Sequence, residues 1–493
     1  MRATANKLTA IAGAVLLAAC SQPTVDNGDS VTPDNVVAGA GRQIVQIDPD
    51  NDPRVWLEEV EGEAAIEWVE GQNTRTFDRL QGDERYQGMF DQALAIYQSE
   101  DRIPGGALYG GFVWNFWQDA TNTHGLWRRT TMDSYVTETP EWDIILDLDA
   151  LSEAEGRNWV WRGANCLGPD YEHCMVTLSD GGSDAAVRRE FSISARDFVA
   201  GGFETPEAKG GVSWIDADTL LVGLATAAAD TTEPGYPSVA YRWERGSALE
   251  DATEVVRGDR SDVGLFSFRA EDFDGTVYMM ASQAVTFYDT NWWYLPADAA
   301  PVQLPLPAKS SIQDIFHGQL VFTIEEDWEP VEGGASFAQG SLLSFDIAEW
   351  VASGALPAVH TVYVPRARQS LGGMGATRTA FLVEIDENVV GGLEAFHFEN
   401  GVWSSETIPV PANMTIGLGS TNNHEDIAFM TAEGFLTPGT LSLVNSAELT
   451  VEAIKSIPAR FDAEGLVVEQ LEASSTDGTM IPYFVVRRED TVM

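Results

Sequence analysis

Short apolar segments, broken by Gly, Asp or Pro, follow one another from residue 103 to about residue 460. Segments of this length bounded by turn residues predict β-strands. Clear examples lie at residues 112–117, 175–178, 220–224, 277–280 and 292–295. Because no long helical pattern is interleaved over roughly 350 residues, the strands must bury one another, as in a sandwich array or a β-propeller.

One hairpin can be placed directly. Asn400 and Gly401 lie between two apolar runs, and Asn-Gly is the strongest local signal for a two-residue turn between antiparallel strands. A seven-bladed propeller would allot roughly 50 residues to each blade, close to the usual length of such repeats. The repeat is too diverged for the blades to be counted from the sequence itself.

Two helices are predicted before the strands begin. In the first, apolar residues recur with helical spacing on one face, and in the second the spacing is i, i+3, i+4, i+7, i+8 and i+11. Such stripes are typical of helices that pack on a core. The first set is Ile66, Val69, Phe77 and Leu80, with Asn73 on the same face, and the second is Tyr86, Met89, Phe90, Ala93, Leu94 and Tyr97.

The N-terminus has the pattern of an export signal. Arg2 and Lys7 precede an apolar stretch at residues 8–19 that is too short to span a bilayer. The stretch ends in Leu-Ala-Ala-Cys, which resembles the bacterial lipobox, so residues 1–19 are predicted to be a lipoprotein signal peptide and Cys20 the acylated residue. The alternative is an ordinary signal peptide with a coincidental cysteine.

Acyl chains on Cys20 would hold the protein at a membrane surface. Residues 20–50 are polar, which suits a flexible acidic tether. We therefore expect an exported protein that is lipid-anchored to the bacterial cell envelope. Ser21 is compatible with the periplasmic face of the outer membrane, while the choice of leaflet stays open.

Two further cysteines, Cys166 and Cys174, lie eight positions apart. In an exported protein this spacing predicts a disulfide that closes a turn. A metal site would have to recruit His173, but two cysteines and one histidine at this spacing match no zinc pattern.

The charge balance excludes one class of partner. The chain carries 76 acidic and 29 basic residues, a net charge of −47, which would repel the phosphate backbone of nucleic acids. The acidity could attract cationic peptides or metal ions. Because the acidic residues are scattered rather than clustered in runs, a solvated acidic surface is the favoured interpretation.

Three separated stretches resemble the prolyl oligopeptidase family of serine peptidases. DPRVWLEEV at residues 52–60, followed by WVEGQN at 68–73, is similar to the N-terminal signature of that family. FLTPGTL at 435–441 resembles its last blade, and VEQLEASSTDGTMIPYF at 468–484 its return to the hydrolase domain. A stretch at 115–131 also fits the first blade of a bacterial branch.

The resemblance implies a mainly β protein, with a seven-bladed β-propeller inserted into a split α/β-hydrolase domain. On that pattern, residues 51–104 form an N-terminal helical segment of the hydrolase domain, residues 105–462 the propeller, and residues 463–493 the start of the rest of the hydrolase domain, including its first strand. Short peptides would be the substrates of the complete enzyme.

The groups that would cleave a peptide bond are missing from the sequence. A serine nucleophile in this fold occupies a Gly-x-Ser-x-Gly turn, and no serine among the 493 residues has both glycines. Ser183, Ser213 and Ser336 have the preceding glycine only. The resemblance places the catalytic serine, acid and histidine beyond Met493, and no motif for a cofactor or metal is found.

The histidines do not change this conclusion. All six fall in the predicted propeller, and none accompanies a serine in a suitable turn; they are His124, His173, His317, His360, His397 and His424. Two hypotheses remain. The chain is the N-terminal and propeller part of an oligopeptidase, inactive by itself, or it is a non-catalytic lipid-anchored propeller that binds a ligand or partner protein. The first is favoured, because otherwise the helices of residues 52–100 would expose large apolar faces.

Overall fold

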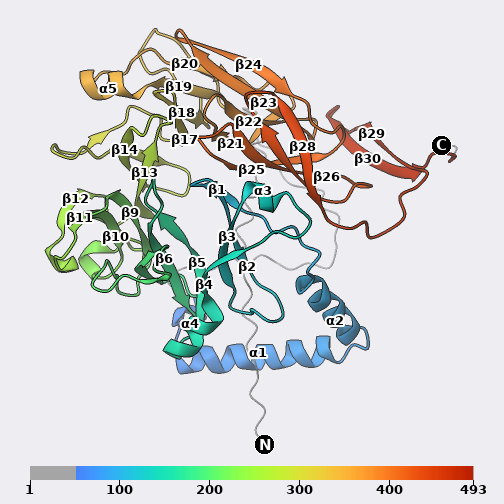
Figure 1. Cartoon of the computed structure of the whole chain (residues 1–493), viewed down its shortest axis with the longest axis horizontal. Helices are drawn as coiled ribbons and strands as arrows, with labels where there is room; N and C mark the ends of the chain where they lie inside the picture. The colour runs from blue at the N-terminus through green and yellow to red at the C-terminus, as the bar shows by residue number, and fades with distance from the viewer. Residues whose placement is uncertain (1–51, 492–493) are drawn as a thin grey trace, which may run out of the picture. The chain divides into compact units, whose positions relative to one another are not determined.

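The computed structural model describes residues 52–491 and is shown in Figure 1. The predicted signal peptide, the predicted tether up to residue 50 and Cys20 lie outside the described residues. The chain divides into two units, residues 1–99 and residues 100–493, which are described separately below. Among residues 52–491, no helix is both long enough and apolar enough to cross a membrane.

The described part of the first unit is helical. It consists of the 3₁₀ helix η2 (Val55–Glu58) and the α-helices α1 (Glu63–Gln81) and α2 (Tyr86–Tyr97). Glu63 in the first turn of α1 and Arg79 in its last turn have the charges that the helix dipole favours. Both predicted helices are therefore confirmed.

The predicted burial of their apolar stripes is not seen. Ile66, Phe77 and Leu80 of α1 are 45%, 52% and 53% exposed, and Met89 of α2 is 68% exposed. The physical reason is size, since two helices cannot cover both stripes by packing on each other. The sequence periodicity thus identified apolar faces that the two helices do not cover by themselves.

The second unit contains seven four-stranded antiparallel sheets, each made of four consecutive strands in chain order. The first three sheets are β1 (Ala107–Tyr109), β2 (Phe112–Trp117), β3 (Leu126–Thr131), β4 (Asp143–Asp147); β5 (Trp159–Cys166), β6 (His173–Asp180), β7 (Val187–Ser192), β8 (Asp197–Phe198); and β9 (Gly210–Asp216), β10 (Thr219–Leu224), β11 (Val239–Glu244), β12 (Thr253–Arg257).

The remaining four sheets are β13 (Gly264–Glu271), β14 (Val277–Ala284), β15 (Thr290–Tyr294), β16 (Val302–Gln303); β17 (Ser310–Phe316), β18 (Gln319–Ile324), β19 (Leu342–Asp346), β20 (His360–Tyr363); β21 (Gln369–Ala376), β22 (Phe381–Glu387), β23 (Val390–Glu399), β24 (Val402–Ile408); and β25 (Thr415–Thr421), β26 (Ile427–Glu433), β27 (Thr440–Asn445), β28 (Thr450–Ser456). Short helices interrupt the connections: α3 (Met132–Tyr135), α4 (Leu148–Glu155), α5 (Ile347–Ser353), η3 (Ala228–Asp230) and η4 (Leu249–Asp251).

The sheets are the blades of a seven-bladed β-propeller, as the resemblance implied. The first strands of neighbouring blades contact one another from β9 to β13, β17, β21 and β25, and β25 contacts β1. First strands that meet in this way surround a common axis. The predicted strands at residues 112–117, 175–178, 220–224 and 277–280 all lie within second strands, while residues 292–294 lie in the third strand β15.

The Asn400-Gly401 hairpin is confirmed. Glu399 at the end of β23 pairs with Val402 at the start of β24, so the turn has two residues. Asn400 and Gly401 have φ angles of 53° and 80°, which are the left-handed conformations that this tight turn needs.

The ring closes between blade 1 (β1–β4) and blade 7 (β25–β28) without a shared strand. The backbone N–H of Leu108 in β1 donates to Ser420 Oγ in β25 at 2.9 Å. Leu108, Val113 and Tyr135 of blade 1 pack in one apolar cluster with Phe429 and Leu441 of blade 7. Because each sheet uses only its own strands, side-chain packing carries most of this contact.

A two-stranded hairpin follows the last blade. It consists of β29 (Leu466–Ser474) and β30 (Met480–Arg488), where the resemblance implied a single strand. The ring of Phe484 lies 5.2 Å from that of Phe435, and Gln470 donates to the backbone oxygen of Asn388. Ile481 and Tyr483 on β30 are exposed.

Burial between neighbouring blades dominates the core. One cluster joins Phe316, Val321 and Leu342 of blade 5 (β17–β20) to Phe381 and Phe396 of blade 6 (β21–β24). Removing one of these side chains should therefore destabilise two blades at once.

We predict that Phe381→Ala lowers the free energy of unfolding by about 3–5 kcal/mol, because it removes a fully buried ring and leaves a cavity. Val402→Ala is the matched control on the same blade, since Val402 is 65% exposed. The control should stay within about 0.5 kcal/mol of the wild type. Denaturant unfolding followed by tryptophan fluorescence measures both, and equal effects of the two substitutions would contradict the assigned packing.

Candidate functional site

The serines with a preceding glycine do not occupy nucleophile turns. Ser183 Oγ donates to the backbone oxygen of Ala185, and Ser213 Oγ to that of Ser267, each at 3.0 Å. Ser336 is exposed in the loop between β18 and β19. In the described part of the chain, none of these three serines lies on a strand-to-helix turn.

The histidine rings are held by groups other than serine hydroxyls. Within residues 52–491 their recorded polar partners are backbone oxygens and carboxylates. The pairs are His124 with Trp159 O, His173 with Glu190, His317 with Arg378 O, His397 with Thr379 O and Glu406, and His424 with Glu271; the ring of His360 packs on Phe398. No nucleophile and base are brought together there.

The pair that most resembles part of a catalytic triad is His173 and Glu190, since His173 Nδ1 lies 2.9 Å from Glu190 Oε1. Arg245 from blade 3 (β9–β12) also donates to the buried Glu190 carboxylate through its two terminal nitrogens, Nη1 and Nη2, at 2.7 and 3.1 Å. Burial would raise the pKa of Glu190, but Arg245 and the backbone N–H of Phe203 lower it overall. The cluster thus ties blade 3 to blade 2 (β5–β8) and has no hydroxyl to activate.

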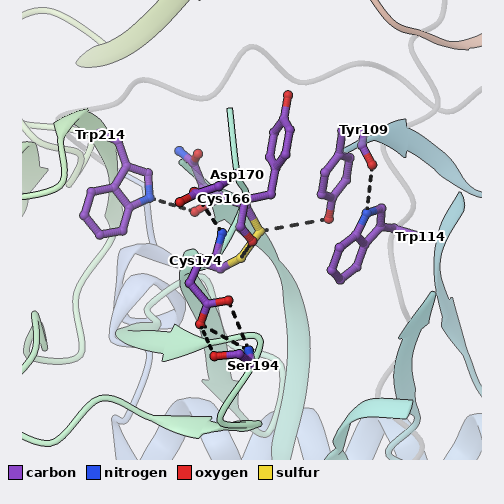
Figure 2. Close-up of a disulfide and its surroundings, with 10 residues drawn as sticks. Tyr109, Trp114, Cys166, Asp170, Cys174, Ser194 and Trp214 are labelled. Atoms are coloured by element: carbon purple, nitrogen blue, oxygen red, sulfur yellow. Dashed lines mark hydrogen bonds between the residues drawn. A yellow bond between two sulfur atoms is a disulfide. The ribbon is translucent and has the colours of Figure 1, made fainter. Parts of the chain in front are cut away.

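Figure 2 shows the disulfide between Cys166 at the end of β5 and Cys174 in β6, with an S–S distance of 2.01 Å. Trp214 Nε1 of blade 3 donates to Asn165 O at 2.9 Å on one side. On the other side the ring of Tyr109 stacks on Trp114, and its hydroxyl lies 4.0 Å from Cys166 Sγ.

A metal site at this turn is not supported. His173 points to Glu190 rather than to the sulfur atoms. Among residues 52–491, no group of three or more His, Cys, Asp or Glu side chains is placed to hold a metal ion.

A cleft of about 570 Å³ lies between blades 1 and 7. Two of its basic side chains stack on tryptophans: Arg128 lies between Trp117 and Trp142, and Arg102 covers Trp117. Burial lowers the pKa of Arg128 to about 10. These stacked groups all lie in blade 1 or just before it, whereas a contact with blade 7 is made by Lys455, whose Nζ donates to Thr137 O at 2.8 Å.

The propeller axis is the remaining candidate site. In each blade the first and third strands run in one direction and the second and fourth in the other. The chain therefore enters the first strands and leaves the fourth strands at the same end of the axis, which we call the entry side. The seven turns that follow the first strands surround the opposite end, which we call the turn-side mouth.

Two carboxylates link neighbouring blades along the axis. Asp314 in β17 accepts hydrogen bonds from its neighbour Ile315 N at 2.8 Å and from Ala376 N of blade 6 at 3.1 Å. Glu384 accepts from Leu418 N of blade 7 and from a backbone N–H of β21, both at 3.2 Å. Burial raises the pKa of Asp314 to about 6 and also raises that of Glu384.

Glycines make this close approach possible. A Cβ atom at Gly372 would lie 2.7 Å from Glu384 Cδ, and one at Gly375 would lie 2.4 Å from Thr421 Oγ1 of the next blade. The inner strands of blades 6 and 7 are therefore too close for a side chain at Gly375, while at Gly372 the space is taken by the Glu384 side chain of the same blade.

The described residues form a propeller in which the first strand begins and the last strand ends on the same side of the axis. No nucleophile and base are brought together among these residues. The comparisons with known proteins agree with this class. A family model described as "Prolyl oligopeptidase, N-terminal beta-propeller domain" matches residues 41–456. The chain belongs to this family, and peptidase activity is the function of the family.

Two curated relatives are named as peptidases. The chain is 39% identical to an uncharacterized peptidase, y4nA, of Sinorhizobium fredii over 445 residues, which are 89% of this chain and 61% of the relative. It is 27% identical to an uncharacterized peptidase, RP174, of Rickettsia prowazekii, covering 88% of this chain and 62% of the relative. The chain thus spans less than two thirds of the length of both relatives.

Solved structures share the fold. A post-proline cleaving enzyme from Rickettsia typhi matches with a TM-score of 0.80 and 26% identity, over 88% of this chain and 65% of that one. Prolyl oligopeptidase B from Galerina marginata, solved with a 35mer hydrolysis and macrocyclization substrate, matches with a TM-score of 0.64 and 16% identity, over 90% of this chain and 62% of that one.

The raised pKa of Asp314 predicts a pH dependence of stability. Its folded-state pKa of about 6 lies above the usual 3.8, so the unfolded chain loses this proton first as the pH rises. The stability contributed by this group is therefore fully present below about pH 4 and is lost as the pH rises toward 6.

Asp314→Asn should remove this dependence. Between pH 4 and pH 7 the variant should gain stability relative to the wild type by at most about 3 kcal/mol, the equivalent of roughly two pKa units. Denaturant midpoints across this range give the difference. Glu332→Gln, which removes an exposed negative charge, is the control and should run parallel to the wild type. A parallel profile for Asp314→Asn as well would contradict the assigned burial.

Proposed function

We propose that this chain is the N-terminal and propeller part of a serine-type oligopeptidase that hydrolyses short peptides, and that the propeller restricts their access to the catalytic domain. The observation that carries the proposal is the match to the family's propeller domain over residues 41–456, together with the closed ring of seven blades. The name of the Rickettsia typhi enzyme points to cleavage after proline, and we take such substrates as the first to test.

The chain alone is expected to be inactive. No serine in the 493-residue sequence has the glycine pattern of the nucleophile turn. Acyl transfer by this chemistry needs a serine, a histidine and a carboxylate in hydrogen-bond contact. The catalytic groups would come from a hydrolase domain outside the present sequence.

The exposed apolar side chains of the chain support a missing partner domain. They occur on α1 and α2 in the first unit and on β30 in the second. Apolar stripes on helices such as α1 and α2 are usually packed against a core in the working protein. A hydrolase domain joined to both ends of the propeller is the covering element that we propose.

Export and lipid attachment complete the proposal. The basic start, the apolar run at residues 8–19 and Cys20 support an acylated envelope protein that stands on the periplasmic face of the outer membrane. The short peptides of that compartment would be its substrates.

A fluorophosphonate probe, which reacts covalently with activated serines, tests the assignment of catalysis. The 493-residue chain should remain unlabelled and should not hydrolyse a fluorogenic Gly-Pro substrate. A longer protein in which the chain is continuous with a hydrolase domain should be labelled and should turn the substrate over.

Substitution of the serine in the Gly-x-Ser-x-Gly turn of that longer protein is the control, and it should abolish both signals. Labelling of the 493-residue chain would contradict the proposal that its catalytic groups lie elsewhere. A correctly folded longer protein without peptidase activity would contradict the proposed function itself.

Metabolic labelling with an alkyne fatty acid tests the anchor. The chain expressed with its own N-terminus in a Gram-negative host should incorporate the label and fractionate with the outer membrane, because the acyl chains of a diacylglycerol joined to Cys20 by a thioether partition into lipid. Cys20→Ser should lose the label, whereas Cys166→Ser should keep it. Equal labelling of wild type and Cys20→Ser would contradict the proposed site.

A further inference from the structure

Blade 7 contacts blade 4 (β13–β16) at the turn-side mouth. The side-chain amide of Asn423, in the turn after β25, donates to the backbone oxygen of Glu271 at the end of β13, at 2.7 Å. The next residue in that turn, His424, places Nε2 3.8 Å from a carboxylate oxygen of Glu271. Two polar contacts thus join the same pair of blades.

These two blades are not neighbours in the ring. Blades 5 and 6 separate them on the shorter path, and blades 1, 2 and 3 on the longer one. Side chains of blade 7 can reach the backbone of blade 4 only by crossing the axis. The contact therefore lies across the turn-side mouth and does not run along the ring of turns that surrounds it.

The turns along the shorter path are tied together as well. The Asp272 carboxylate accepts the N–H of His317 at 3.0 Å and also that of the following residue, Gly318. His317 Nε2 lies 2.8 Å from the backbone oxygen of Arg378, and Arg378 N donates to Glu425 O at 3.0 Å. Blades 4, 5, 6 and 7 thus form a continuous hydrogen-bonded rim.

Blade 2 contributes an aromatic side chain to the same mouth. Tyr171 lies in the disulfide-closed turn between β5 and β6, and its ring is 5.1 Å from that of Tyr109 in blade 1. The fit is close, since a Cβ atom on Gly110 would lie 2.9 Å from the Tyr171 ring. Burial raises the pKa of Tyr171, and the carboxylate of Glu271 in blade 4 raises it further, while the charge of Arg269 lowers it.

The backbone of Tyr171 is strained. Its φ angle is +53°, a conformation that is costly for a bulky residue and that persists only where the surroundings enforce it. Cys166 and Cys174 bracket this turn and join its two ends. The disulfide thus holds the ring of Tyr171 at the mouth.

We propose that the turn-side mouth of the propeller channel is closed by a latch, formed by Glu271, Asn423 and His424 and supported by Tyr171 of the disulfide-closed turn. The channel then opens on the entry side alone, and peptides reach a catalytic domain without passing through the turn-side mouth. The closure rests on the geometry of this chain, whereas the peptide route rests on the proposed peptidase function.

Cross-linking across the axis tests the closure in the 493-residue chain. Cysteines are introduced as the pair Glu271→Cys and Asn423→Cys, with Cys20→Ser and the native disulfide intact. The probe is dibromobimane, which becomes strongly fluorescent when both arms react with neighbouring thiols. We expect this pair to give intramolecular fluorescence at least tenfold above either single variant.

A matched pair distinguishes closure from general flexibility. The pair Asp218→Cys and Asn423→Cys places cysteines in two turns of the same mouth that share no recorded contact. The fluorescence of this pair should stay at the level of the single variants. The pair Glu271→Cys with His424→Cys is the second variant if the first fails to fold. Normal reaction of both cysteines with a monofunctional maleimide, without fluorescence from either Glu271 pair, would overturn the latch.

The peptide route is tested in the longer, peptidase-active protein. Linking residues 271 and 423 should leave hydrolysis of the Gly-Pro substrate within twofold of the unlinked double variant, because substrate does not use this mouth. A tenfold or greater loss on linking would overturn the proposed route. If the unlinked protein shows no hydrolysis at all, the proposed function fails, while the fluorescence measurement still decides whether the mouth is closed.

Discussion

Burial between neighbouring blades is the constraint on which this structure depends. A four-stranded sheet has two faces, and in a propeller both are covered only when a blade stands on each side. The cluster that joins Phe316 to Phe381 shows this between blades 5 and 6, and the one that joins Leu108 to Phe429 shows it where the ring closes. Each blade is therefore stable through its neighbours. Blades 1 and 7 are neighbours that do not follow each other in the chain, so their contact depends on packing and hydrogen bonds.

Crowding at the axis follows from this packing. Seven first strands share one axis, and a side chain at Gly375 in blade 6 would meet Thr421 of blade 7. Backbone N–H groups that lose their partners at the inner strands are satisfied by carboxylates from the adjacent sheet, as Asp314 and Glu384 show. Burying a carboxylate carries a cost in free energy, which appears as the raised pKa of both groups. The same crowding brings the turn residues of blades 4 and 7 together across the mouth.

The sequence predicted the features that local pattern determines. The strand at residues 112–117, the Asn400-Gly401 turn and the two N-terminal helices each follow from the spacing of a few neighbouring residues. The contacts between blades around the axis are not local. Asn423 and Glu271 are 152 positions apart in the sequence, and Leu108 and Ser420 are 312 apart. A single sequence does not show which turn will face which across a ring. The Gly-Gly pair at residues 372 and 373 was a visible signal of close backbone approach, but nothing nearby indicated that Glu384 would fill the space.

The described residues of the propeller bring no nucleophile and base together. The described histidines that make polar contacts bind other groups of the propeller blades, as His173 does with Glu190 and His317 with Arg378. On the proposed function, the propeller would restrict access, and the nucleophile, base and oxyanion donors would belong to another domain.

Hydrogen exchange of the 493-residue chain, read blade by blade by mass spectrometry, tests most directly whether the ring is closed. A ring held by burial between neighbours should protect the second strands of all seven blades, with β2 and β26 at the closure exchanging as slowly as β14 and β18 opposite them. Rapid exchange confined to β2 and β26, with the middle blades protected, would show an open ring and contradict the account.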